Sequence, residues 1–283
     1  MRQTILIGSG WNSYLFRAEI NSLIGYEEIL HPRVVSISDI SSTRNLSKSA
    51  LLDDILINTE IISNFTPNIS EKILAKYISD WAINNLPKGS FAVRTRKLGE
   101  GAMSLSRNNI ENEVGTLLMS DVNPVSLENP EHEVVVVLAG LEDQSSREKE
   151  LEFLKPVIFW GLRTPIPNNR KYENRSPIDR PFFKPVSLEP RLARLMISLS
   201  HKPDSSPLKI IDPFCGTGGI VIEATLQNMQ VLASDLDIEM VHGTRKNLEW
   251  CKGSGEYIVK QCSVKEIVSE WGKITNCSFV FDP

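Results

Sequence analysis

The segment Lys209–Ile220 constrains the fold of this chain more than any other stretch. A short apolar run ends in the acid Asp212, a glycine-rich turn follows, and a helix-like pattern comes next. Such a strand, loop and helix presents backbone N–H groups to a ligand at the start of the helix. Further apolar runs lie near 231–235, 257–260 and 278–282, with helical patterns between them. This alternation predicts a parallel sheet whose strand ends share one ligand-binding edge.

The glycine loop does not match two common phosphate-binding patterns. No Lys-Ser/Thr pair follows the glycines, and Val221 stands where a GxGxxG motif needs its last glycine. An acid at the end of the first strand would repel a pyrophosphate, but it suits a cationic ligand. A second acid, Asp235, ends the next strand at a spacing that suits a ribose diol. The acids and glycines together favour S-adenosylmethionine, which is a sulfonium cation with a ribose.

A purely structural interpretation of the same acids stays open. Asp212 could cap the following helix, and Asp235 could form a surface turn. The joint occurrence of acids and glycines in this order favours the ligand. For Asp237 the structural role is the better interpretation, as the cap of a helix that carries Met240 and Leu248.

Composition limits the classes of protein to consider. The chain has 283 residues and a net charge of -4, so nucleic-acid binding would need a local basic patch. The four cysteines show no CxxC spacing, and no apolar run approaches 18 residues. We therefore expect reduced thiols, no metal, no membrane span and a cytoplasmic location.

The periodicity divides the chain into four parts, at 1–52, 53–164, 165–186 and 187–283. The first is a small α/β unit with strands at 4–7 and 34–37 and a helix capped by Asn12 or Ser13. Its Gly8-Ser-Gly10 is a lone GxG and indicates little. The third part is rich in Pro, Asn and Arg, which predicts a semi-rigid linker. The fourth opens with a helix that accommodates Pro190 in its first turn.

The second part combines alternating strands with two helices. Strands are expected at 91–97, 134–138 and 157–160. Ser70 is the predicted cap of the first helix, and Asn108 or Asn109 that of the second. Arg94, Arg96, Lys97 and Arg107 cluster here and are the candidate RNA contacts. From Lys155 to Arg194 the chain carries nine basic residues against three acids, which is either a phosphate-binding stretch or an ordinary solvated linker.

Three motifs resemble class I S-adenosylmethionine-dependent methyltransferases that modify exocyclic amines. They are Asp212-Pro-Phe-Cys-Gly-Thr-Gly-Gly219, Ser234-Asp-Leu-Asp237 and Phe281-Asp-Pro283. In that family the fourth strand usually ends in Asn/Asp-Pro-Pro-Tyr/Phe, whereas the sequence here stops after two of these residues. The family also has Gln-x-Asp-Ala after the third strand, where this chain reads Gln261-Cys-Ser-Val264. The resemblance implies cofactor contacts from Asp212, Phe214, Gly216, Gly218, Gly219, Asp235 and Ser263.

Upstream segments look like a THUMP domain, an RNA-binding module usually preceded by a ferredoxin-like unit. They are Phe91-Ala-Val-Arg-Thr-Arg96, Asn109-Ile-Glu-Asn-Glu-Val-Gly115 and Leu127-Glu-Asn-Pro130. The junction from Arg180 to Arg194 is similar to that of archaeal tRNA guanosine-10 N2-methyltransferases. The expected fold is therefore α/β: a ferredoxin-like plus THUMP region, followed by a Rossmann-like methyltransferase domain of which only the N-terminal half is visible.

The resemblance also implies a reaction, methyl transfer to the N2 amine of a tRNA guanine. The Asp282 carboxylate and the Pro283 carbonyl would be the catalytic groups, because they can accept the amine protons and orient N2. Two alternatives remain: a THUMP methyltransferase for another tRNA or rRNA guanosine, and a non-catalytic RNA-binding protein with a vestigial fold. Because the expected sheet is incomplete, inactivity of this chain on its own also stays open.

Overall fold

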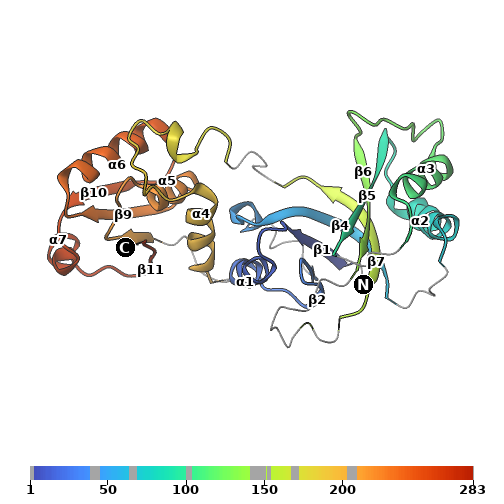
Figure 1. The fold of residues 1–283 in the computed structure, drawn as a ribbon, viewed down its shortest axis with the longest axis horizontal. Coiled ribbons are helices and arrows are strands. Elements are labelled where there is room, and N and C mark those ends of the chain that lie inside the picture. Colours follow the sequence, from blue (N-terminus) through green and yellow to red (C-terminus); the bar gives the residue numbers. More distant parts are fainter. Residues whose placement is uncertain are drawn as a thin grey trace. The chain divides into compact units, whose positions relative to one another are not determined.

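The computed structural model describes residues 3–38, 45–63, 69–99, 104–140, 151, 154–166, 172–202 and 209–282. It divides into two compact units (Figure 1). The N-terminal unit comprises Met1–Arg17, Tyr26–Ser41 and Leu52–Ile166. The C-terminal unit comprises Ala18–Gly25, Ser42–Leu51 and Pro167–Pro283. Among the described residues, no helix has both the length and the apolar character needed to cross a bilayer.

The N-terminal unit is built on one seven-stranded sheet, ordered β2-β3-β1-β4-β7-β6-β5. The neighbouring strands are antiparallel except β5 and β6, which are parallel. The strands are β1 (Gln3–Gly8), β2 (Glu28–His31), β3 (Val34–Ile37), β4 (Leu52–Ile62), β5 (Phe91–Leu98), β6 (His132–Ala139) and β7 (Val157–Thr164). The sheet contains strands from both predicted units, 1–52 and 53–164, whose boundary stays a prediction.

Two helices accompany this sheet, α2 (Glu71–Asn85) and α3 (Arg107–Leu118), whereas α1 (Ser13–Leu23) is divided between the two units. The predicted cap Ser70 is confirmed, since its side chain accepts a hydrogen bond from the Ile73 N–H at 3.4 Å. The predicted cap of the next helix is wrong: α3 begins earlier, and Ser106 caps it by accepting from the Asn109 N–H. Apolar faces of α2 and α3 pack with the sheet around Trp160, Phe91 and Val134.

The central strand β4 was not predicted. Its apolar pattern is interrupted by Asp53 and Asp54, residues that are depleted in strands. Asp54 is nevertheless buried, because it forms ion pairs with Arg96 on β5 and Arg163 on β7. The charge of Asp54, which makes this strand hard to predict from the sequence, is neutralised by residues that are distant along the chain.

The C-terminal unit contains a four-stranded parallel sheet, ordered β10-β9-β8-β11. Its strands are β8 (Lys209–Asp212), β9 (Gln230–Asp235), β10 (Tyr257–Gln261) and β11 (Cys277–Phe279). Its helices are α4 (Pro190–Leu199), α5 (Gly219–Leu226), α6 (Ile238–Cys251) and α7 (Ile267–Trp271), with short 3-10 turns η3 (Pro177–Asp179) and η4 (Val264–Glu266). The predicted alternation of strand and helix is confirmed, although β11 ends earlier than expected. Ile210, Val231 and Val259 face one core with α5 and α6.

A buried acid fixes the segment before α4 to the domain core. Glu223 on α5 is 1 % exposed and pairs with Arg175 at 3.2 Å and Arg194 at 3.4 Å. Arg180 is buried nearby and donates to the Leu188 carbonyl at 2.9 Å. Lys184 pairs with Glu239 at 2.8 Å. These four basic residues of the predicted phosphate-binding stretch therefore have partners within the protein, and buried Arg180 and Arg194 do not fit an ordinary solvated linker either.

Candidate functional site

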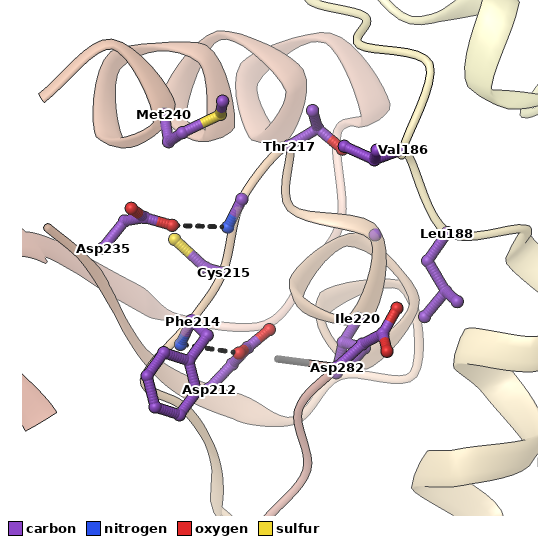
Figure 2. Close-up of a pocket in the computed structure, with 12 residues that line it drawn as sticks. Val186, Leu188, Asp212, Phe214, Cys215, Thr217, Ile220, Asp235, Met240 and Asp282 are labelled. Atoms are coloured by element: carbon purple, nitrogen blue, oxygen red, sulfur yellow. Dashed lines mark hydrogen bonds between the residues drawn. The ribbon is translucent and has the colours of Figure 1, made fainter. Parts of the chain in front are cut away.

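A pocket of about 310 Å³ opens at the carboxyl ends of β8 and β9 (Figure 2). This is the edge where parallel sheets bind ligands. Its volume lies at the lower end of the range for small-molecule sites. The pocket is lined by Val186, Leu188, Asp212, Phe214, Cys215, Gly216, Thr217, Gly219, Ile220, Asp235, Met240 and Asp282. Six of these are site residues predicted from the sequence: Asp212, Phe214, Gly216, Gly219, Asp235 and Asp282.

Asp212 gives the pocket its chemical character. Its side chain is almost fully buried, at 2 % exposure, and one carboxylate oxygen accepts from the Phe214 N–H at 3.2 Å. Burial raises the pKa of Asp212 to about 7; the Phe214 N–H opposes this rise, while the charges of Asp235 and Asp282 add to it. Asp212 does not cap α5, whose N-cap is Gly218. A buried carboxyl beside two other acids is suited to a cationic ligand.

Asp235 connects the end of β9 to the glycine loop (Figure 2). One carboxylate oxygen accepts from the Gly216 N–H at 2.9 Å, and the other accepts from the Asp237 N–H at 2.9 Å. The turn role that was considered as an alternative is therefore present, on a side chain that also lines the pocket. Asp237 caps α6 as predicted, accepting from the Glu239 N–H at 2.8 Å.

The three glycines of the loop serve different purposes. Gly216 has a φ of 50°, and a Cβ added there would have no heavy atom within 4 Å, so this glycine leaves open space in the pocket. Gly218 has a φ of 84° and lies against Thr244, and it does not line the pocket. A Cβ on Gly219 would lie 3.1 Å from the Leu188 Cβ. Gly216 and Gly218 are thus needed for their left-handed backbone, and Gly219 for close packing.

The predicted catalytic residues lie at the end of the described chain. Asp282 lines the pocket, whereas Pro283 lies outside the described residues. The ring of the preceding residue, Phe281, contacts the ring of Phe214 with centroids 5.4 Å apart. Both rings are partly exposed, and Phe214 lines the pocket.

Ser263 does not line the pocket. Its hydroxyl accepts from the Lys265 N–H at 3.3 Å, and its own N–H donates to Glu266 at 2.8 Å, forming a capping box for η4. Its predicted contact with adenine stays a prediction. In the described part of the chain, no group of three or more His, Cys, Asp or Glu side chains is arranged to hold a metal ion.

Several residues that line the pocket were not predicted from the sequence. Cys215 and Thr217 belong to the loop itself, and Ile220 and Met240 belong to the adjacent helices. The elements that carry these four residues were predicted, but the residues were not named as part of the site. Burial raises the pKa of the Cys215 thiol to about 12, which makes it an inert lining residue. Val186 and Leu188 come from the predicted linker and the residues just after it, where composition gave no signal for a pocket wall.

The candidate RNA contacts lie in the N-terminal unit and fall into two groups. Arg94 pairs with Glu133 at 3.2 Å and also donates to the Leu127 carbonyl. Arg96 pairs with Asp54. Lys97 and Arg107 are more exposed, at the end of β5 and the start of α3. RNA binding by these four residues stays a prediction, and the first two already have acidic partners within the protein.

A protein family matches part of the C-terminal unit. The family model described as "RMKL-like, methyltransferase domain" matches residues 177–276, which include the glycine loop and both acids at the ends of β8 and β9. Residues 177–276 are similar to an RMKL-like methyltransferase domain. The matched range thus contains all the pocket residues except Asp282.

Similar proteins agree with this identification. The chain is 36 % identical over 171 residues to a tRNA (guanine(10)-N2)-dimethyltransferase of Methanothermobacter thermautotrophicus, covering 60 % of this chain and 44 % of the relative. It is 31 % identical over 173 residues to the Pyrococcus abyssi protein of the same name, covering 61 % and 46 %. The matched region spans less than half the length of these curated relatives.

A solved structure shares the fold. The crystal structure of TrmN from Thermus thermophilus superimposes with a TM-score of 0.53 at 20 % identity, covering 96 % of this chain and 76 % of that chain. The expected α/β fold class, with a Rossmann-like unit, is thereby confirmed.

Proposed function

We propose that this chain binds S-adenosylmethionine and takes part in methylating the N2 amine of a tRNA guanine, with guanosine 10 as the target. The observation that carries the proposal is the pocket with three carboxylates at the ends of parallel strands, in a domain similar to tRNA (guanine(10)-N2)-dimethyltransferases. A THUMP-type RNA-binding role for the N-terminal unit and a cytoplasmic location belong to the same proposal.

The described residues fit the cofactor in charge and shape. Asp212, Asp235 and Asp282 provide a negative environment for a ligand that carries a sulfonium and an ammonium group. Gly216 leaves room for a ligand to approach the loop backbone. Asp235 keeps acceptor capacity for ribose hydroxyls, since each carboxylate oxygen can accept a second hydrogen bond. When bound, S-adenosylmethionine would supply an electrophilic methyl group.

The chain's own contribution to the reaction is orientation. The guanine N2 lone pair is delocalised into the ring, so the amine is a poor nucleophile. A carboxylate at Asp282 accepts an amine proton in a hydrogen bond and aims the lone pair into the pocket. Orientation of this kind is worth up to about 7–11 kcal/mol in ideal cases. Because a stacked base cannot reach such a pocket, the guanine must be extruded from the RNA.

Two measurements test the proposal. Titration calorimetry with S-adenosylhomocysteine should show one binding site per chain. Incubation with an unmodified tRNA transcript and S-adenosylmethionine, followed by nucleoside mass spectrometry, should show N2-methylguanosine at position 10. Absence of cofactor binding would refute the proposal. Product at another guanosine would correct the target, and cofactor-independent RNA binding without product would favour a non-catalytic protein.

A further inference from the structure

The segment Arg180–Leu188, which we call the strap, crosses the glycine loop and forms one wall of the pocket. Val186 and Leu188 line the pocket together with the acids (Figure 2). At one end of the strap, the Phe182 N–H donates to the Asn247 side-chain oxygen at 2.9 Å, and the Asn247 amide donates to the Phe182 carbonyl at 2.8 Å. A single side chain on α6 therefore satisfies both backbone groups of Phe182.

Asn247 also holds the loop. Its amide donates to the Thr217 carbonyl at 2.9 Å, and the residue is 0 % exposed. The same side chain thus connects the strap to the loop through three hydrogen bonds. Because Asn247 is shielded from water, losing one of these partners would leave a buried polar group unsatisfied.

Close packing reinforces this connection. A Cβ on Gly243, one turn before Asn247, would lie 2.0 Å from the Phe182 ring, so only glycine leaves space for the ring there. At the other end of the strap, the Thr217 hydroxyl donates to the Ser187 hydroxyl at 3.0 Å. The strap is therefore fixed to the loop on both sides of Val186.

We infer that Asn247 is a positioning residue of the cofactor pocket and that Gly243 provides the seat for the strap. Neither residue lines the pocket. They act by fixing the strap against the loop, so that Val186 and Leu188 enclose the ligand. This inference rests on the proposed cofactor binding, but the anchoring of the strap can be measured without any ligand.

The first variant is Gly243→Ala, tested by two methods. Hydrogen–deuterium exchange of ligand-free protein should show faster exchange across residues 182–188. Calorimetry should show S-adenosylhomocysteine affinity reduced by about tenfold or more, as expected for loss of one or two buried hydrogen bonds. Gly115→Ala is the matched control, since nothing lies within 4 Å of a Cβ at Gly115 on α3. It should leave both measurements unchanged.

A double-mutant cycle distinguishes the packing of Phe182 against Gly243 from a general loss of stability. Phe182→Ala removes the ring with which the methyl group of Gly243→Ala would clash. It keeps the backbone groups that form hydrogen bonds with Asn247. In the Phe182→Ala background, Gly243→Ala should cost little further affinity, because the clash is gone. Additive losses would overturn the inference for Gly243.

Asn247→Asp tests the positioning residue directly. The substitution keeps the shape and the acceptor for the Phe182 N–H, but it replaces the donors to Phe182 and Thr217 with an acceptor. Exchange across the strap should rise and S-adenosylhomocysteine affinity should fall, whereas a protein with wild-type exchange and affinity would refute the inference. If wild type fails to bind the ligand, the proposed function fails, and the exchange experiment still decides whether Asn247 anchors the strap.

Discussion

The Asp235 carboxylate accepts a hydrogen bond from the backbone N–H of Gly216 at 2.9 Å, across 19 residues of sequence. The acid that was expected to hold the ligand therefore also shapes the loop that would surround it. A ligand that bonds to Asp235 meets a carboxylate whose orientation is already fixed by two backbone donors. Such preorganisation lowers the entropic cost of binding.

Asp235→Asn should weaken cofactor binding by about 10- to 100-fold, because a hydrogen bond to a charged acceptor contributes roughly 1.5–3 kcal/mol. The amide keeps the size of the side chain but can accept at one atom only. Calorimetry with S-adenosylhomocysteine measures the effect. Asp237→Asn is the control, since Asn is as good an N-cap for α6 as Asp. Equal affinities for the two variants would contradict the role of Asp235.

Cofactor affinity should increase as the pH rises from 6 to 8. The pKa of Asp212 is raised to about 7 in the ligand-free protein, and only its ionised form attracts a cation. Asp212→Asn should bind S-adenosylmethionine weakly and lose this pH dependence. Calorimetry at several pH values, in buffers of different ionisation enthalpy, would also detect the proton released on binding. A flat profile for wild type would exclude Asp212 as the charged partner.

Asp212 affects stability and cofactor affinity in opposite directions as the pH rises. Because burial raises its folded-state pKa above the value of 3.8 expected in the unfolded chain, the folded protein holds a proton that the unfolded chain releases. The stability contributed by Asp212 therefore decreases as the pH rises from about 4 to about 7. Asp212→Asn should remove this loss and raise the unfolding midpoint at pH 8 relative to wild type, as measured by urea denaturation.

Glu223→Gln should destabilise the C-terminal unit by about 3–5 kcal/mol, because it leaves the charges of buried Arg194 and partly buried Arg175 without their counter-ion. Urea unfolding measures the loss. Glu239→Gln removes the exposed partner of Lys184 and should cost at most about 1 kcal/mol. Similar losses of stability for both variants would show that burial does not strengthen the contribution of Glu223.

The two groups of basic residues in the N-terminal unit should respond differently to substitution. Lys97→Glu with Arg107→Glu should weaken tRNA binding and reduce its salt dependence, since both residues are exposed. Arg96→Gln should mainly reduce stability, because it leaves Asp54 with fewer partners. Filter binding at several salt concentrations and thermal unfolding separate the two effects. If only Arg96→Gln impaired RNA binding, then Arg96 would be the RNA contact and Lys97 and Arg107 would not.

Asp282→Asn should reduce methyl transfer by about 100-fold or more while cofactor affinity stays near that of wild type. The amide can still accept one hydrogen bond, but it lacks the charge that polarises the guanine amine. Single-turnover methylation of a tRNA transcript, with calorimetry in parallel, gives both quantities. Full turnover by the variant would exclude Asp282 from the reaction.

Local patterns predicted the parallel half of the fold well. Strands β8, β9 and β10 are short apolar runs that end at acids or turns, and their spacing through helices leaves few alternative topologies. Strand β4 escaped this reasoning, since Asp54 is compatible with a buried strand only when Arg96 and Arg163 are beside it. No local pattern carries information about partners on other strands.

The same distinction applies to the site. Asp212, Gly216 and Asp235 lie in a motif whose chemistry can be interpreted from spacing alone. Leu188 and Val186 could not be predicted, because a proline-rich linker becomes a pocket wall only through its contact with Asn247, 65 residues beyond Phe182. Ser263 stands where the family has an acid after the third strand, and in this structure its side chain caps η4.

The anchoring of the strap by α6 has a consequence during synthesis on the ribosome. The strap ends at Leu188, and its anchor Asn247 is made 59 residues later (247 minus 188). At roughly 5–20 residues per second, this interval lasts about 3–12 seconds. Throughout that time Phe182, Val186 and Leu188 have no completed domain to pack against. We expect the nascent chain to be most susceptible to chaperone capture and misfolding in this interval.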